Sequence, residues 1–322
     1  MMTESWVEPI SEEVDRVEDF ILDLLHSDNP ELDEMCRYVI QAGGKRIRPI
    51  ICILSHLACG GKDVDRAVSV GSAFEIVHSA SLVHDDINDD GEIRRGRQVL
   101  HKKYTLTKAL VAGDFMLVKG YQALGNMGPE VVNVIVKAAS MMSESEFMQQ
   151  DFERNLDVTE EDYFKIINGK TAMLINASAL AGAYIATDNM DYINTIDEFS
   201  KDVGLAFQIV DDVLDVTGSA RDTGKKVGID ITEGKPTLPV IYAMQDPEHG
   251  ALIRKLYTYK DLSKDQVADA LDLIKKTDAV DRCLAKADEI VDRAIASLQG
   301  LPPSQYRDSL AGMAKYIVDR DR

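Results

Sequence analysis

Long stretches with helical periodicity, interrupted by few prolines and glycines, constrain this chain more than any other feature. The 322 residues include only 9 Pro and 21 Gly. Within residues 131–155, 192–216 and 261–298, apolar side chains recur at spacings of three and four, which is the repeat of an amphipathic helix. No run of alternating apolar residues bounded by turn residues indicates a strand. The sequence therefore predicts an all-α protein, with many helices joined by short loops.

Few segments interrupt this pattern, and none has the composition of a linker between domains. The longest is 218–236, in which four glycines are interspersed with lysines and acids. Loops of this length inside compact domains are often active-site lids. Shorter breaks lie at 126–130 and 300–303. We therefore expect a single domain that spans residues 1–322.

The charge balance and the cysteines exclude several classes of protein. The chain carries 36 Lys and Arg against 55 Asp and Glu, a net charge of −19, which argues against sequence-independent binding to nucleic acid or to anionic lipid. The acidic N-terminus lacks the pattern of a secretory signal, and no apolar run is long enough for a transmembrane helix. The four cysteines form neither a CxxC pair nor a zinc-ligand pattern. We expect reduced, buried thiols and a cytoplasmic location.

Two acidic motifs of the form DDxxD are candidates for a metal site. The first spans 85–89, and on a helix Asp85 and Asp89 lie one turn apart on the same face. Crowded carboxylates repel each other, and Mg²⁺ relieves that repulsion best where phosphates complete its shell. A single short motif arises easily by chance in an acidic chain. The second motif, 211–215, interrupts a strongly apolar helix, where acids are costly without a cation, and Gln208 points into the same space.

Cations gather near glycines and near these acids. The segment 43–49 places three cations after two glycines, Arg94 and Arg95 follow the first acid motif, and 169–171 reads Gly-Lys-Thr. Three lysines also lie within 225–235. Side-chain and backbone donors can both approach phosphate oxygens at such positions, so the clusters are candidate phosphate sites.

The common nucleotide and hydrolase motifs are absent. Gly169-Lys170-Thr171 is not a Walker A loop, because Phe164 stands where that motif needs its first glycine. No GxGxxG, HExxH or GxSxG pattern occurs. The sequence therefore supports neither an NTPase, a dinucleotide-binding fold, a zinc protease nor an α/β-hydrolase.

Taken together, these motifs resemble the trans-isoprenyl diphosphate synthases, also called polyprenyl synthetases. The resemblance covers nearly the whole chain. It includes GGKRIRP (43–49), FEIVHSASLVHDDINDD (74–90), RRG (94–96), AGDFML (112–117), GKTA (169–172), FQIVDDVLDV (207–216), TGKKVGIDITEGKPTLP (223–239) and YRDSLAGMAKYIVDR (306–320). It implies a large bundle of mostly antiparallel helices around a deep central cavity, in a homodimer. It also implies an enzyme that condenses isopentenyl diphosphate with an allylic diphosphate into an all-trans polyprenyl diphosphate.

The resemblance further implies a role for each cluster. Three Mg²⁺ ions would be held by Asp85, Asp89 and Asp211, with Asp86, Asp212 and Asp215 as supporting or water-mediated ligands. The diphosphate of isopentenyl diphosphate would be bound by Lys45, Arg48, His78 and Arg95. The allylic diphosphate would be bound by Arg94, Lys170, Lys225 and Lys235. Thr171 and Gln208 would direct oxygen dipoles at the carbocation. Lys170 would be the third catalytic residue.

Product length is expected to depend on residues upstream of Asp85. Short-chain members of the family carry a bulky aromatic four or five positions before the first aspartate, where this chain has Ser81 and Ala80. Val77 is next, and Phe74 is the first large aromatic on that side. We therefore expect products of C20 or longer, around C25–C30.

Two alternatives stay open at this point. A class I terpene cyclase is also helical and Mg²⁺-dependent, but it needs no second diphosphate site, and its second acid motif usually mixes Asn, Ser and Glu. A non-catalytic subunit of a heteromeric synthase typically loses its acid motifs, whereas both are intact here.

Overall fold

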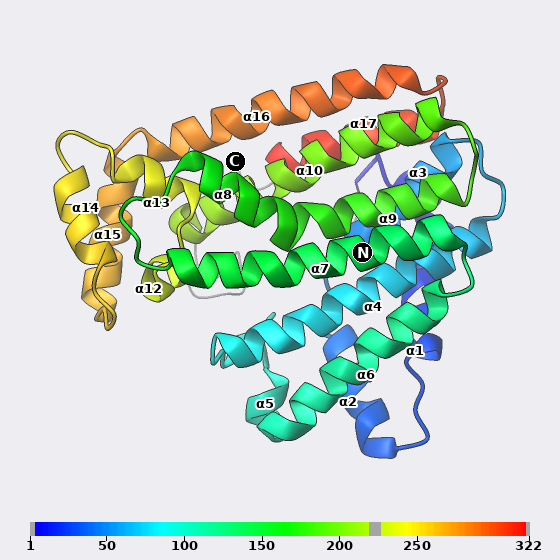
Figure 1. Cartoon of the computed structure of the whole chain (residues 1–322), viewed down its shortest axis with the longest axis horizontal. Helices are drawn as coiled ribbons and strands as arrows, with labels where there is room; N and C mark the ends of the chain where they lie inside the picture. The colour runs from blue at the N-terminus through cyan, green and yellow to red at the C-terminus, as the bar shows by residue number, and fades with distance from the viewer. Residues whose placement is uncertain (1–3, 219–226, 320–322) are drawn as a thin grey trace. The chain divides into compact units, whose positions relative to one another are not determined.

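The computed structural model describes residues 4–218 and 227–319, and their architecture is all-α (Figure 1). The chain divides into two compact units. Unit 1 comprises Met1–Lys137, Leu174–Glu198 and Leu298–Met313, and unit 2 comprises Ala138–Met173, Phe199–Ser297 and Ala314–Arg322. The all-α prediction is confirmed, whereas a single domain over 1–322 stays a prediction.

The elements follow one another along the chain with short connections. In order they are η1 (Glu8–Ile10), α1 (Ser11–Leu24), α2 (Pro30–Ile40), α3 (Ile47–Ala58), α4 (Val64–Asn88), β1 (Ile93–Arg94), β2 (Arg97–Gln98), α5 (Leu100–Lys103), α6 (Leu106–Leu124), α7 (Pro129–Phe152), α8 (Glu160–Ile167), η2 (Asn168–Ala172), α9 (Met173–Tyr184), α10 (Met190–Thr217), α12 (Ile229–Glu233), α13 (Leu238–Ala243), α14 (Gly250–Tyr257), α15 (Lys264–Lys276), α16 (Ala279–Ser297), η3 (Leu298–Gly300) and α17 (Gln305–Asp319).

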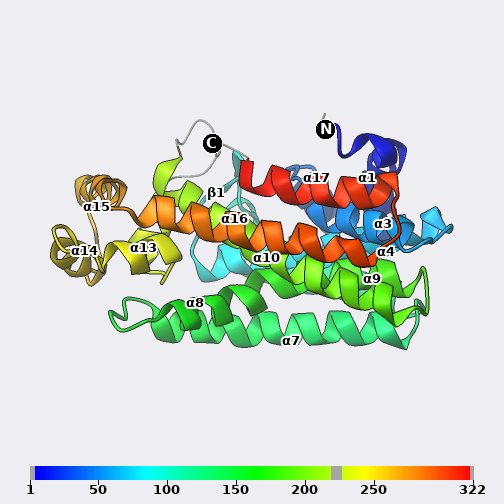
Figure 2. The same cartoon turned by 90° about the horizontal axis from the view of Figure 1, so that it is seen from above.

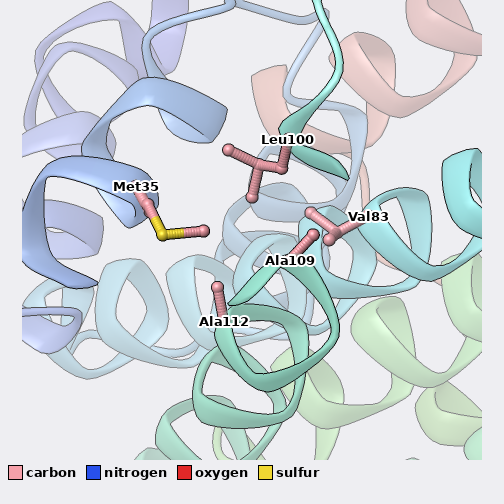
Figure 3. Close-up of a cluster of buried hydrophobic side chains, with 5 residues drawn as sticks. All are labelled: Met35, Val83, Leu100, Ala109 and Ala112. Atoms are coloured by element: carbon pink, nitrogen blue, oxygen red, sulfur yellow. The ribbon is translucent and has the colours of Figure 1, made fainter. Parts of the chain in front are cut away.

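Helix α4 is the central helix of unit 1 and packs against α1, α3 and α6, the last of which runs beside it in Figure 1. Small residues make this possible. A Cβ on Gly120 of α6 would lie 2.7 Å from Val77 Cγ2, and one on Gly71 would lie 2.8 Å from Pro49 Cα. Apolar residues line every side of α4, as expected for a helix surrounded by others. Its C-terminal half packs into the cluster of Met35, Val83, Leu100, Ala109 and Ala112 (Figure 3).

A short antiparallel hairpin follows α4, and the sequence did not indicate it. Arg94 of β1 pairs with Arg97 of β2, and the two turn residues Arg95 and Gly96 have φ values of 50° and 72°. Positive φ at both central residues is the geometry of a type I′ turn, which matches the twist of a two-residue hairpin. Strands of two residues are too short to show an alternating pattern, so no sequence pattern indicated this hairpin.

Unit 2 divides one periodic stretch into two helices and corrects one prediction. The periodic stretch 261–298 is two helices, α15 and α16, because Thr277 is extended (ψ 174°) and its Oγ1 accepts a hydrogen bond from Ala279 N at 3.2 Å. The segment 218–236, expected to be a loop, contains the short helix α12; its residues 219–226 lie outside the described residues. Contacts join α14 to α15 and α13 to α16 (Figure 2).

The cysteine prediction is confirmed, since Cys36, Cys52, Cys59 and Cys283 are all buried and free. No helix among the described residues combines the length and the apolar composition that crossing a membrane requires.

Candidate active-site clusters in the two units

The first acid motif lies at the C-terminal end of α4. This helix of 25 residues ends at Asn88, and Asp89 N donates to Asp85 O at 2.9 Å, which closes one further helical turn. The expected spacing of one turn between Asp85 and Asp89 is therefore confirmed. The C-terminus of a helix carries partial negative charge and disfavours nearby carboxylates. Two oxygen-donor side chains held there fit a hard divalent cation.

Asp86 is held by Arg94 of the hairpin. Arg94 Nε donates to Asp86 Oδ1 at 2.7 Å, and the Asp86 side chain is only 13% exposed. Burial raises the pKa of Asp86, and the charge and hydrogen bond of Arg94 oppose that rise. The contact therefore fixes Arg94 next to the acid motif, and Asp86 faces a guanidinium.

The glycine-rich segment before α3 holds Arg95. The guanidinium of Arg95 donates to Gly43 O, and a Cβ on Gly44 would lie 2.8 Å from Arg95 Nη1. Gly43 and Gly44 also have φ values of 83° and 149°, which side chains disfavour. Two glycines at these positions thus let the guanidinium lie directly on the backbone.

His78 lies two helical turns before Asp85 and is surrounded by positive charge. Its pKa is held well below 6.5, first by burial and then by the charges of Arg48, Arg95, Arg94 and Arg46. Arg48 is buried, and its backbone oxygen accepts from Ser178 Oγ at 2.8 Å. Lys45, three residues before Arg48, is exposed. Guanidinium charge acting on one neutral imidazole favours an anion nearby, although Arg46 and Arg94 are also paired with Glu75 and Asp86.

Sequence analysis missed a buried ion pair behind this cluster. Arg46 Nη1 lies 3.1 Å from Glu75 Oε1, and their side chains are 10% and 3% exposed. Arg46 Nη2 also donates to Ile40 O at 2.8 Å. Arg46 is therefore directed into the unit, whereas Lys45 is exposed. The available signal was Glu75, an isolated acid in the apolar stretch 70–77.

In unit 2 the second acid motif lies on α10, and its three aspartates differ in environment. Asp212 is 5% exposed. Its Oδ2 accepts from Tyr163 Oη at 2.7 Å, and its Oδ1 accepts from Gln208 Nε2 at 2.7 Å. Burial and the charges of Asp230 and Asp211 raise the pKa of Asp212, while the two hydrogen bonds oppose the rise. Asp211, by contrast, is only half-buried.

Asp215 anchors the segment that follows α10. Its two oxygens accept from Ile229 N at 3.2 Å and from Asp230 N at 3.0 Å, the first backbone donors of α12. Two residues past α12, Lys235 Nζ lies 2.5 Å from Glu233 Oε2. Lys225 lies outside the described residues. The two backbone donors of α12 hold the Asp215 carboxylate at the start of that helix.

The predicted Gly-Lys-Thr break is a π-helical turn between α8 and α9. Such turns are frequent at functional sites. Thr171 Oγ1 donates to Gln208 Oε1 at 2.6 Å, so the structure brings these two predicted residues together. Lys170 Nζ lies 2.6 Å from Glu146 Oε2 and 3.2 Å from Gln149 Oε1. Sequence analysis missed Glu146 and Gln149, which lie in an ordinary helical pattern.

The residues expected to control product length all lie on α4. Phe74, Val77 and Ala80 are fully buried, and Ser81 is partly buried with its Oγ donating to His78 O at 2.9 Å. Val77 packs on Gly120 of α6. Phe74, Ser81 and Asp85 lie on one face of the helix because they are separated by seven and four residues.

Among residues 4–218 and 227–319, no three His, Cys, Asp or Glu side chains converge closely enough to hold a metal ion by themselves. A metal bound by fewer side chains needs oxygen atoms from another molecule, and Mg²⁺ commonly takes them from substrate phosphates. The roles assigned to the site residues stay predictions.

Comparisons with known proteins agree with this geometry. The sequence matches the polyprenyl synthetase family over residues 29–274. It is 33% identical to an all-trans-nonaprenyl-diphosphate synthase (geranyl-diphosphate specific) of Rhodobacter capsulatus, over 97% of this chain and 96% of that protein. It is 34% identical to heptaprenyl diphosphate synthase component 2 of Geobacillus stearothermophilus, over 97% of each.

A solved structure shares the fold. The polyprenyl synthase of Caulobacter crescentus CB15, in complex with calcium and isoprenyl diphosphate, superposes with a TM-score of 0.93 at 28% identity, over 98% of this chain and 97% of that one. The match over most of the chain, the all-α fold and the two acid motifs lead to one conclusion: this chain belongs to the polyprenyl synthetase family.

Proposed function

We propose that this chain is a prenyltransferase that condenses isopentenyl diphosphate with an allylic diphosphate and so makes an all-trans polyprenyl diphosphate. The observation that carries the proposal is the basic group beside the first acid motif: Arg95 lies on the two glycines before α3, and the charges of Arg48 and Arg95 act on His78, two turns along α4 from Asp85. A condensing enzyme needs an anion site for its second diphosphate, whereas a cyclase has one diphosphate to bind. Relatives named as nonaprenyl and octaprenyl diphosphate synthases support the same chemistry.

The donor set fits a divalent cation, and the solved relative with calcium supports this. We assign three Mg²⁺ ions to Asp85, Asp89 and Asp211, all carboxylates that can share a cation with phosphate oxygens. When bound, Mg²⁺ neutralises the negative charge that develops on the leaving diphosphate. The contacts of Asp86, Asp212 and Asp215 with Arg94, Tyr163 and backbone N–H groups suit a supporting role.

The basic residues bind and orient the two substrates. Lys45, Arg48, His78 and Arg95 hold the diphosphate of isopentenyl diphosphate, and His78 does so as a neutral hydrogen-bond donor because its pKa is low. Arg94, Lys170, Lys225 and Lys235 hold the allylic diphosphate. Lys170 Nζ and Lys235 Nζ lie 2.6 and 2.5 Å from the carboxylate oxygens of Glu146 and Glu233, and these ion pairs keep the two lysine side chains in place.

The reaction then proceeds in three steps: ionisation, attack and proton loss. The allylic carbon–oxygen bond breaks, and the electron pair leaves with the diphosphate. The terminal alkene of isopentenyl diphosphate attacks the allylic cation, and a proton passes to the departing diphosphate as the new trans double bond forms. Thr171 and Gln208 direct oxygen atoms at the cation, and the positive charge of Lys170 stabilises the departing diphosphate.

Product length and assembly are part of the proposal. We propose products of C20 or longer, around C25–C30, made by a homodimer in the cytoplasm. A heteromeric assembly is the second candidate, because one relative is named component 2 of a heptaprenyl synthase. A non-catalytic role within such an assembly is disfavoured by the intact acid motifs on α4 and α10.

The purified chain, assayed with ¹⁴C-isopentenyl diphosphate and an allylic primer, tests the proposal. Incorporation of label into an acid-labile polyprenyl diphosphate is the expected result. A cyclic hydrocarbon formed from the allylic substrate alone would indicate a cyclase. Activity that appears only with a second, different polypeptide would indicate a subunit of a heteromeric enzyme.

A further inference from the structure

We propose that Tyr163 is a positioning residue, which acts through Asp212 to fix the side-chain amide of Gln208 with its oxygen directed at the reacting carbon. The inference rests on the proposed function and concerns a residue that carries no charge and belongs to neither acid motif. All of the groups involved lie in unit 2.

Three hydrogen bonds connect Tyr163 to the π-helical turn. Tyr163 Oη donates to Asp212 Oδ2 at 2.7 Å, Gln208 Nε2 donates to Asp212 Oδ1 at 2.7 Å, and Thr171 Oγ1 donates to Gln208 Oε1 at 2.6 Å. The chain of bonds thus joins α8, α10 and η2. Tyr163 is 1% exposed and Asp212 is 5% exposed, so water does not compete for the bond between them, and the two bonds of Gln208 are half-buried.

This arrangement permits one orientation of the Gln208 amide. Both oxygens of Asp212 accept a hydrogen bond, one from Tyr163 Oη and the other from Gln208 Nε2, so the amide group that faces Asp212 is the NH₂. The amide oxygen must then face Thr171, as observed. One lone pair of Oε1 is used by Thr171, and a carbonyl oxygen has a second one. That second lone pair supplies the negative end of a dipole for a developing cation.

Tyr163 is what holds Asp212 in this position. The tyrosine occupies the oxygen of Asp212 that Gln208 does not use, so the carboxylate cannot turn about its side-chain bonds without losing a buried hydrogen bond. Without the phenol, Asp212 can rotate, and Gln208 is then free to turn its amide by half a turn. The turned amide would present N–H donors to the cation, which reverses the sign of its contribution.

A purely structural role for Tyr163 is the competing hypothesis. The ring of Tyr163 is buried and meets the ring of Phe164 edge-on, with centroids 5.6 Å apart. The variant Tyr163→Phe keeps that ring and removes only the hydroxyl. A matched control exists in the same unit, because Tyr242 is 4% exposed and donates to Glu160 Oε2 at 2.8 Å, a carboxylate with no link to Gln208.

The experiment compares Tyr163→Phe and Tyr242→Phe with the wild-type chain. We expect both variants to lower Tm, since each loses one hydroxyl that donates to a carboxylate, and Tyr163→Phe at least as much as Tyr242→Phe, because the Tyr163 bond is fully buried and the Tyr242 bond is half-buried. Only Tyr163→Phe should lower kcat, by about tenfold, with KM for both substrates within about threefold of wild type. Calorimetry should find that inorganic pyrophosphate binds Tyr163→Phe as tightly as it binds the wild-type chain.

A double-mutant cycle identifies the route of the effect. In a Gln208→Leu background, Tyr163→Phe should lower kcat by less than about twofold, because the group it positions is gone. Full additivity of the two substitutions would overturn the inference, as would a Tyr163→Phe enzyme that behaves like Tyr242→Phe or one that loses pyrophosphate binding. A wild-type chain that makes no polyprenyl product would instead overturn the proposed function, and the inference with it.

Discussion

The substitution Ser81→Phe should shorten the product by about two isoprene units. Helix α4 is continuous from Val64 to Asn88, so the separation of any two of its residues follows from the rise of 1.5 Å per residue. Ser81 lies about 40° around the helix from Asp85, and Phe74 lies about 20° from it, at 3.6 residues per turn. A product that grows from Asp85 along this face, as proposed, would pass small Ser81 before it reaches Phe74.

The size of the effect follows from this spacing. Seven residues separate Ser81 from Phe74, a distance of about 10 Å along the helix axis. An extended isoprene unit is about 4–5 Å long from its carbon–carbon bonds, so a new aromatic at Ser81 removes room for about two units. A wild-type product of C25–C30 would become C15–C20.

The assay is mass spectrometry of the dephosphorylated products, with Ser81→Ala as the matched control. That control removes the Ser81 hydroxyl, which bonds His78 O, without adding bulk, and it should leave the product length unchanged. Phe74→Ala should lengthen the product. Ala80→Phe should shorten it where the product path also borders the side of α4 that carries Ala80, about 140° around the helix from Asp85. A wild-type enzyme that stops at C15, or a Ser81→Phe enzyme with unchanged products, would refute the proposed floor.

Three further predictions concern substrate binding, pH and stability. In steady-state kinetics, Arg48→Ala should chiefly raise KM for isopentenyl diphosphate and Lys235→Ala should chiefly weaken use of the allylic substrate; the reverse pattern would exchange the two sites. The folded chain holds the pKa of His78 well below 6.5. As the pH falls below 6.5, the unfolded chain therefore binds more protons than the folded chain, and the free energy of unfolding should fall. This free energy should fall less in His78→Gln, and an equal pH dependence in the two proteins would contradict the low pKa of His78. Arg154→Met should lower the free energy of unfolding, measured by urea denaturation, by about 2–4 kcal/mol. The reason is that the Arg154 guanidinium donates to Thr232 O at 2.6 Å and to Tyr257 O at 3.2 Å. A change below about 0.5 kcal/mol would show that these bonds contribute little.

The helices and the acid motifs could be predicted because their signals are local. A repeat of three to four residues specifies a helix wherever it occurs, and α7 and α10 were expected within a few residues of their observed ends. The spacing of Asp85 and Asp89 needed nothing beyond the helical rise.

Features that depend on distant residues could not be predicted in this way. Glu75 and Arg46 are 29 residues apart, and Tyr163 and Asp212 are 49 apart, so no local pattern connects either pair. The break at Thr277 contains neither Gly nor Pro, and a hairpin of two-residue strands has no periodicity to detect. In each case a side-chain hydrogen bond or a turn conformation decides the structure, and the sequence indicates only that a polar residue is present.

The metal dependence of Asp85→Ala and Asp211→Ala tests the central claim most directly. Each substitution removes a carboxylate assigned to Mg²⁺, and kcat at saturating Mg²⁺ should fall by several orders of magnitude. Asp272→Ala, which removes an exposed carboxylate of α15, should retain wild-type kcat, and thermal unfolding should show all three variants folded. Folded Asp85→Ala or Asp211→Ala protein with near-native activity in Mg²⁺ would contradict the account.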